Sequence, residues 1–180
     1  VSILGALLIA ATLVPAHSEA TSEEKLVLVA STTQIADFAR QVVGDRCVVQ
    51  CVLSPGADPH TYQPTPEDVA LVKGADLCLE NGLHLEGKNW MRTLATDAGK
   101  AIVTCAEGVE PIEIEEEGQK IADPHAWFSP ANVARYVNNI LKALSSLDPE
   151  GQGEYEARAK LYLQQLRVLD AWVRDQVSRI

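Results

Sequence analysis

The pattern of apolar and polar positions predicts that strands and helices alternate along most of the chain. Four short apolar runs have the length and the β-branched content of buried strands: 25–32, 47–55, 75–82 and 101–108. The segments between them repeat apolar residues at helical spacing: 31–45, 65–74 and 89–99. Such regular alternation predicts right-handed βαβ units around a parallel sheet. The expected fold class is therefore α/β, with a parallel four-stranded sheet flanked by helices.

Capping residues mark where the second of these helices begins and ends. Thr65 is a suitable N-cap, Pro66 fits the first helical position, and Asp68 completes a capping-box pattern. Gly74 is a typical stop. These signals predict a helix that follows directly on a turn-rich segment.

Two further helices are predicted in the last third of the chain. The first, within 129–149, has Ser129 as N-cap and an apolar stripe. The second runs over 154–180 and would be about 40 Å long, more than so small a lobe requires. Its predicted apolar stripe consists of Tyr155, Tyr162, Leu166, Leu169, Val173 and Val177. We interpret 150–180 as a truncated linking helix that leads to a part of the protein beyond this sequence.

The segment 108–122 interrupts the alternation. It is acidic, contains a glycine and includes three consecutive glutamates, but it has no histidine. We expect a surface loop in which the glutamates form a solvated face and not a metal site.

Composition and charge narrow the class of partner. The chain has 180 residues, of which 47% are hydrophobic and 22% charged, as in an ordinary soluble domain. Its net charge of -10 argues against nucleic acid and against anionic membrane surfaces as partners. An acidic surface tolerates cations without proving that it binds them.

The first twenty residues have the pattern of part of a secretory signal peptide. Residues 1–16 are almost wholly apolar, and Ala16-His17-Ser18 and Ser18-Glu19-Ala20 are candidate cleavage sites. Without an initiating Met or a basic n-region, the chain is expected to begin part-way through this signal. No cysteine lies at the cleavage site, so we expect an exported, periplasmic protein that is not lipid-anchored and is not inserted in the membrane after cleavage. A buried N-terminal helix is the alternative.

Four cysteines in an exported chain raise the question of disulfides. Cys47 and Cys51 lie about 13 Å apart along one strand, too far for a bridge. Cys78 and Cys105 would meet only if their strands are neighbours. Buried free thiols are the favoured interpretation, and the sequence leaves the pairing open.

Two of the four histidines follow the same dipeptide, in "GADPHTYQP" and "IADPHAWFSP". Proline stiffens each turn, so Asp-Pro-His can present His60 and His125 from rigid corners near strand ends, where parallel sheets bind ligands. Neutral imidazole is a good ligand for zinc, manganese and iron, and Asp58 and Asp123 are placed to act in the second shell. On spacing alone, two unrelated loop histidines remain an equal alternative.

The blocks "GADPHTYQPTPEDVALVKGADLCLENGLHLE" and "DPHAWFSPANVARYVNNI" resemble the two signature blocks of the metal-binding subunits of bacterial ABC importers for zinc and manganese, the ZnuA/TroA/PsaA-like family. The resemblance extends over residues 25–180. It implies two similar lobes joined by a rigid helix, with the metal in the cleft between them. Residues 25–149 would be the N-terminal lobe, and the C-terminal lobe would be absent from this sequence.

The resemblance also implies a ligand set. His60 and His125 would be the first two metal ligands, with the remaining ligands beyond Ile180. His84 is interpreted as a second-shell or cleft-lining residue, since the family's usual ligands do not include its position. We interpret Glu86 and Trp90 as cleft edge and packing, and Trp127 as a buried ring that fixes the second corner. His17 lies in the signal region and is discounted.

The implied function is capture and handover, without catalysis. The protein would bind Mn²⁺ or Zn²⁺, with Fe²⁺ a further candidate, and deliver it as a monomer to a membrane permease and its ATPase. The lack of histidine in 108–122 favours manganese over zinc as the bound ion. Metal binding should weaken as pH falls through about 6.5, where imidazoles take up protons. A metal-dependent hydrolase and a surface adhesin of the same fold are the alternatives.

Overall fold

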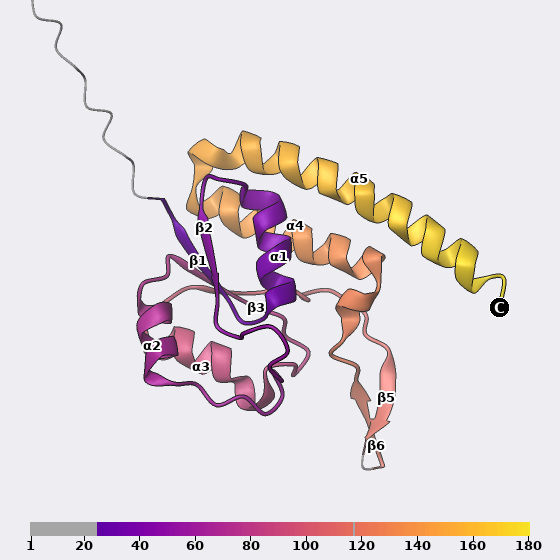
Figure 1. Ribbon diagram of the computed structural model, residues 1–180, viewed down its shortest axis with the longest axis horizontal. Helices are drawn as coiled ribbons and strands as arrows, with labels where there is room; N and C mark the ends of the chain where they lie inside the picture. Colours follow the sequence, from indigo (N-terminus) through magenta and orange to yellow (C-terminus); the bar gives the residue numbers. More distant parts are fainter. Residues whose placement is uncertain (1–24, 117) are drawn as a thin grey trace, which may run out of the picture.

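The structure, a computed structural model, describes residues 25–116 and 118–180. Its main sheet has four parallel strands in the order β2-β1-β3-β4, which confirms the predicted fold class (Figure 1). The strands are β1 (Val27–Ala30), β2 (Val48–Cys51), β3 (Leu77–Glu80) and β4 (Ile102–Thr104). The chain visits β2 on one side of β1 and then crosses to β3 on the other side, so the strand order reverses between β1 and β3.

Helices cover both faces of this sheet (Figure 1). The α-helices are α1 (Thr33–Val43), α2 (Pro66–Lys73), α3 (Trp90–Asp97), α4 (Pro130–Leu147) and α5 (Gln152–Val177). Short 3₁₀ helices precede α3, α4 and α5, namely η1 (Gly87–Asn89), η2 (Ala126–Phe128) and η3 (Pro149–Gly151). Helices α1, α4 and α5 pack on one face, and α2 and α3 on the other.

Alternate residues of the central strands supply the two cores. In β1, Leu28 and Ala30 face α1 and α4, whereas Val29 faces α2 and α3, and all three are fully buried. Successive side chains of a strand point to opposite faces, so a sheet covered on both sides needs an unbroken apolar run. This explains why the strands lack polar alternation.

The predicted helix caps are present, with one exception. Thr65 and Asp68 form a reciprocal capping box at the start of α2, as the sequence predicts. Thr32 caps α1 by accepting from the backbone N–H of Ile35. Ser129 occupies the N-cap of α4, but its side chain makes no capping hydrogen bond.

The prediction of a plain loop at 108–122 is wrong. Residues Glu113–Glu116 (β5) and Gln119–Ala122 (β6) form an antiparallel hairpin that projects from the main body (Figure 1). Ile114 pairs with Ile121 across it, and Glu115 pairs with Lys120. The cross-strand apolar pair and the opposite charges stabilise this hairpin. The prediction failed because the high density of glutamates indicated a loop.

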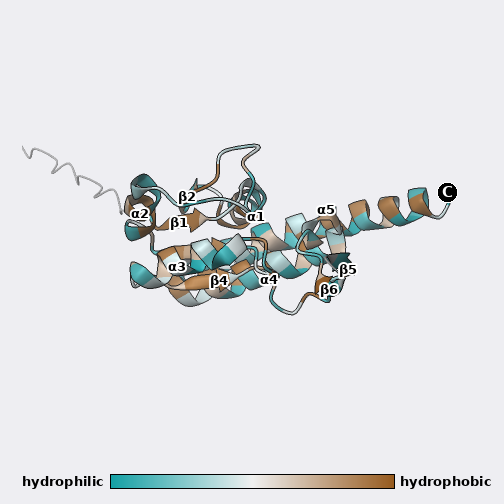
Figure 2. Cartoon of the chain, turned by 90° about the horizontal axis from the view of Figure 1, so that it is seen from below, coloured by the Kyte–Doolittle hydropathy of each residue, from teal (hydrophilic) through white to brown (hydrophobic). Residues whose placement is uncertain are grey.

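Helix α5 begins two residues earlier than predicted and is anchored at its N-terminal end. The guanidinium of Arg46 donates two hydrogen bonds to Asp148, which also accepts from the hydroxyl of Tyr155. Of the predicted stripe, Tyr155 and Leu166 are buried and Tyr162 is half-buried, whereas Leu169 and Val177 are exposed. Figure 2 shows apolar and polar residues interleaved along this helix out to the C-terminal end.

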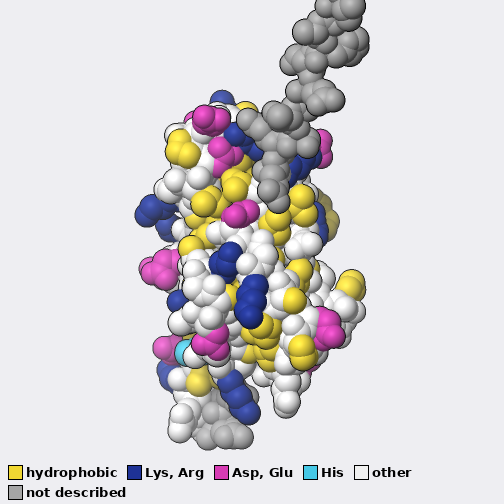
Figure 3. Space-filling model, turned by 90° about the vertical axis from the view of Figure 1, so that its left-hand side faces the viewer, with side chains coloured by type: hydrophobic (Ala, Val, Ile, Leu, Met, Phe, Trp, Pro, Cys, Tyr) yellow, Lys and Arg dark blue, Asp and Glu magenta, His cyan; other side chains and the backbone are white. Residues whose placement is uncertain are grey.

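All four cysteines are free thiols, so the favoured interpretation is confirmed. Residues 1–20, with the predicted signal peptide and His17, lie outside the described residues. Among the helices at 25–116 and 118–180, none is apolar over enough of its length to cross a membrane. On the face shown in Figure 3, acidic and basic side chains are interspersed and do not form a patch of one sign.

Candidate metal site

The two Asp-Pro-His corners meet at the edge of the sheet where strands β1 and β3 end. His60 lies in the long connection from β2 to α2, and His125 lies between β6 and η2. In open parallel sheets this edge, next to the reversal of strand order, is the usual place for ligands. The structure therefore brings together two residues that are 65 positions apart.

The two imidazoles face one another through the same ring atom. The Nε2 atoms of His60 and His125 are 3.3 Å apart, and the ring centroids are 5.3 Å apart at an interplanar angle of 60°. Two nitrogen ligands at about 2.0–2.1 Å from one tetrahedral ion lie about 3.3–3.4 Å from each other. The observed separation has that value, so a single ion can be reached by both rings.

The two aspartates of the repeated motif make different contacts with the histidine that follows them. Asp123 Oδ1 accepts from the backbone N–H of His125 at 2.9 Å and lies 2.8 Å from its Nδ1, which orients the ring and leaves Nε2 as the free ligand atom. Asp58 accepts from the backbone N–H of His60 and from the Thr61 hydroxyl, and it does not touch the His60 ring. The hydrogen bond from the backbone N–H of His60 is the main cause of the lowered pKa of Asp58. The hydrogen bond from the backbone N–H of His125 is likewise the main cause of the lowered pKa of Asp123.

The first corner is held by side chains from α3. The indole Nε1 of Trp90 donates to the carbonyl of Pro59 at 2.9 Å. Trp90 is itself buried and packs edge-on against Tyr62. The packing role predicted for Trp90 is thus extended, because the same ring also fixes the backbone just before His60.

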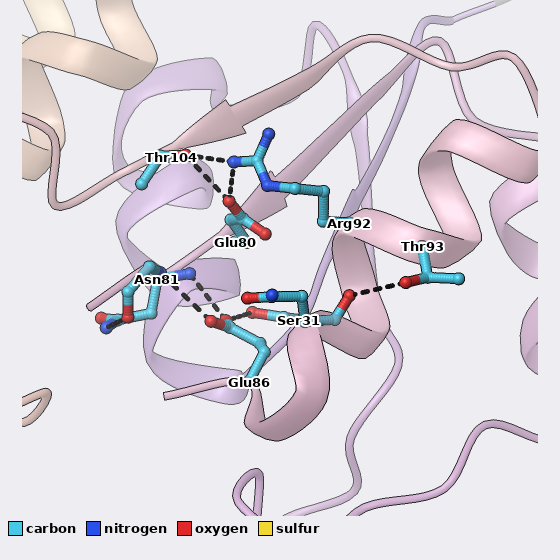
Figure 4. Close-up of polar contacts among 9 residues, drawn as sticks. Ser31, Glu80, Asn81, Glu86, Arg92, Thr93 and Thr104 are labelled. Atoms are coloured by element: carbon cyan, nitrogen blue, oxygen red, sulfur yellow. Dashed lines mark hydrogen bonds and ion pairs between the residues drawn. The ribbon is translucent and has the colours of Figure 1, made fainter. Parts of the chain in front are cut away.

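The sequence places Glu86 at the edge of the cleft, and this expectation is wrong. Glu86 is buried, with 3% of its surface exposed. Its carboxylate accepts from the Ser31 hydroxyl at 2.6 Å, from the N–H of Asn81 at 2.7 Å and from the N–H of Gly82 at 3.1 Å (Figure 4). Burial raises the pKa of this carboxyl, and the three donors counteract the shift.

Asn81 connects this buried network to the second corner. Its Nδ2 donates to the carbonyl of Pro124, directly before His125, at 3.1 Å. Its Oδ1 accepts from the buried hydroxyl of Tyr136 on α4 at 2.9 Å. The sequence analysis did not single out Asn81; the available signal was a polar residue directly after the third apolar run, where parallel sheets bind ligands.

His84 and Trp127 line the surroundings of the imidazole pair. His84 is exposed and faces a cavity of about 540 Å³ that His60, His125 and the β5–β6 hairpin also line. Trp127 packs edge-on against the His125 ring at 5.3 Å and lines a second cavity of about 270 Å³ with both histidines. Trp127 is only partly buried, less than expected.

Within the described residues, no group of three or more His, Cys, Asp or Glu side chains is arranged to hold a metal ion. The site on these residues is therefore a pair of converging imidazoles. Such a pair can supply two of the four or more ligands that a divalent transition metal takes in proteins.

The chain is similar to known metal-binding proteins over most of its length. Residues 28–180 match the family model described as "Zinc-uptake complex component A periplasmic". The iron-binding protein YfeA of Yersinia pestis is 38% identical over 168 residues, which cover 91% of this chain and 53% of YfeA. The manganese ABC transporter substrate-binding lipoprotein ScaA of Streptococcus gordonii is 35% identical over 167 residues, or 89% of this chain and 54% of that protein.

Solved structures give the same relationship. The Mn-bound periplasmic metal binding protein from Candidatus Liberibacter asiaticus superposes with a TM-score of 0.77 at 33% identity, over 87% of this chain and 58% of that one. The chain thus spans about half the length of the curated relatives that it matches. Relatives such as ScaA are named lipoproteins, so the absence of a lipid anchor expected here remains a prediction.

Proposed function

The chain belongs to the ZnuA family of metal-binding subunits of ABC importers, and on this basis we propose that the protein captures a divalent transition metal ion outside the cytoplasm. The ion would be handed to a membrane permease driven by its ATPase. This role does not require turnover of a substrate, so we propose no enzymatic activity. Acidic composition is compatible with a cationic cargo.

The observation that carries this proposal is the 3.3 Å separation of the His60 and His125 Nε2 atoms. We propose that both atoms bind one ion and that Asp123 keeps the proton of His125 on Nδ1. His84, exposed on the wall of the larger cavity, is proposed to line the approach to the ion without binding it in the final complex.

Two imidazoles leave coordination positions of the ion unfilled. We propose that further ligands come from outside the described residues and close the site, which suits storage and delivery better than activation of a bound water. Movement of those ligands on contact with the permease would then release the ion.

For the identity of the ion, Mn²⁺ is the first candidate and Zn²⁺ and Fe²⁺ are the others. The names of the relatives include manganese and iron, and the hairpin at 113–122 contributes no histidine. Any site that contains imidazole will also take Zn²⁺ in vitro, because affinity for nitrogen ligands rises along the divalent series. We further propose that the protein is exported and acts as a monomer.

The decisive experiment titrates the full-length, metal-free protein with Mn²⁺ and with Zn²⁺ by calorimetry. We expect one tightly bound ion per chain and no metal-dependent hydrolysis of a simple aryl ester. Failure to bind either ion would refute the proposal. Metal-dependent turnover of the ester would favour a hydrolase instead.

A further inference from the structure

We propose that residues 81–87, which we call the positioning loop, set the separation of the His60 and His125 rings, and that the carboxylate of Glu86 locks this loop in place. The inference rests on the proposed function, because the separation matters only if both rings bind the same ion. No residue of the loop has to touch the ion for this role.

The positioning loop contacts the main chain at both histidine corners. At one end, Asn81 donates from Nδ2 to the Pro124 carbonyl at 3.1 Å. At the other end, Gly87 lies so close to His60 that a Cβ at this glycine would overlap the His60 carbonyl oxygen. A loop that contacts both corners acts as a spacer between them, since neither corner can shift without meeting it.

The loop has a backbone that needs external support. Leu83 and His84 have φ angles of 53° and 63°, in the left-handed region that non-glycine residues rarely adopt. Leu85 is buried, and Glu86 bonds back to the backbone of Asn81 and to Gly82. These bonds hold the loop closed against its own conformational preference.

Glu86 is suited to this task because both of its oxygens accept hydrogen bonds. Oε1 receives the Ser31 hydroxyl and the Asn81 N–H, and Oε2 receives the Gly82 N–H (Figure 4). A glutamine in the same place would have to turn an NH₂ donor toward one of these donors, which leaves a buried N–H without a partner. Glu86→Gln therefore weakens the lock while it conserves side-chain volume.

The chain offers a matched control six positions earlier. Glu80 is almost equally buried, at 4% exposed, and its carboxylate bonds to Arg92 and Thr104 (Figure 4). These partners belong to α3 and β4 and contact neither histidine corner among the interactions of the described residues. Glu80→Gln thus damages a comparable buried polar group whose hydrogen-bond donors, Arg92 and Thr104, do not bond to the carboxylate of Glu86.

The test uses the full-length protein and three measurements. Zn²⁺ affinity is measured by competition with a chromophoric chelator, the geometry of the site by the visible absorption of bound Co²⁺, and the stability of the metal-free protein by urea unfolding. We expect Glu86→Gln and Gly87→Ala to lower Zn²⁺ affinity about 10- to 100-fold and to alter the Co²⁺ spectrum. Glu80→Gln should lose stability but keep affinity and spectrum. Gly153→Ala, in helix α5 where an added Cβ meets no atom within 4 Å, should keep affinity and spectrum without losing stability.

Two results would overturn the inference. One is an equal loss of affinity in Glu80→Gln and Glu86→Gln, which would indicate general destabilisation. The other is unchanged affinity in both Glu86→Gln and Gly87→Ala while His60→Ala abolishes binding, a result that leaves the proposed function intact. If the unmodified protein binds no Zn²⁺, the proposed function itself fails. Should Glu86→Gln not fold, Ser31→Ala, which removes one donor, decides by the same criteria.

Discussion

The Nε2 atoms of His60 and His125 lie 3.3 Å apart, and each ring is carried by a different connection of the sheet. The His60 side chain is exposed and the His125 side chain is partly buried beside Trp127. Their approach follows from backbone supports at both corners, namely the Trp90 indole on Pro59 and the Asn81 amide on Pro124. Rings held in this way would lose less conformational entropy on binding the proposed ion than rings on free loops.

Replacing either imidazole should remove the site. We expect His60→Ala and His125→Ala in the full-length protein to lower the affinity for Mn²⁺ and Zn²⁺ by orders of magnitude, because each variant deletes one of the two converging ligand atoms. Calorimetry measures the loss directly.

His84→Ala is the matched comparison, since His84 lines the same cavity but is exposed on its wall. It should weaken binding far less than either of the other two variants. Unchanged affinity in both His60→Ala and His125→Ala would end the ligand assignment.

The two aspartates should respond differently to the same substitution. Asp123→Asn removes the negative charge that lies 2.8 Å from His125 Nδ1, so we expect a loss of about tenfold or more in Zn²⁺ affinity. Asp58→Asn alters only contacts to the His60 backbone and to Thr61, and its loss should be much smaller. Equal losses in a chelator-competition assay would show that both residues act through the backbone.

Most of the fold could be predicted from the sequence, because its signals are local. The apolar runs of a sheet covered on both faces, and caps such as Thr65 with Asp68, are readable from neighbouring residues alone. The hairpin was missed because its evidence is a cross-strand pair, Ile114 with Ile121, inside a segment whose charge indicates a loop.

The two histidines that meet could be picked out from the sequence, but the residues that support them could not. A repeated Asp-Pro-His is conspicuous, whereas Glu86 was expected at a cleft edge and is buried. The buried carboxylate is stabilised by two nearby backbone N–H groups, those of Asn81 and Gly82, together with the hydroxyl of Ser31, 55 positions away. The approach of Ser31 is a property of the folded chain, and no pattern of neighbouring residues indicates it.

The contacts of Asp148 with Arg46 and Tyr155 at the start of α5 should make the free energy of unfolding depend on pH. The Arg46 guanidinium, followed by the Tyr155 hydroxyl, holds the pKa of Asp148 well below its usual range. A depressed pKa contributes stability that is present above the unfolded value of about 3.9 and is lost as pH falls toward the folded value.

Asp148→Asn should therefore lower the urea midpoint at pH 7, and the difference from the unmodified protein should shrink as the pH is lowered below about 4. Asp45→Asn, at an exposed carboxylate beside Arg46, is the control and should have little effect at any pH. A difference for Asp148→Asn that persists unchanged at low pH would show that packing, and not charge, explains its effect.

The hydroxyl of Tyr136 should contribute to the free energy of unfolding through its buried hydrogen bond. Tyr136 is fully buried, packs edge-on against Phe38, and donates its only hydroxyl proton to Asn81 Oδ1 at 2.9 Å. Tyr136→Phe keeps the ring but leaves a buried amide oxygen without its donor, so we expect the free energy of unfolding to fall by about 1–3 kcal/mol. Tyr162→Phe, on the half-buried face of α5, should cost less in the same urea experiment. Asn81 also donates a hydrogen bond to the Pro124 carbonyl, so Tyr136→Phe should lower Zn²⁺ affinity as well. If the variant loses stability but keeps its affinity, Asn81 keeps its position without Tyr136.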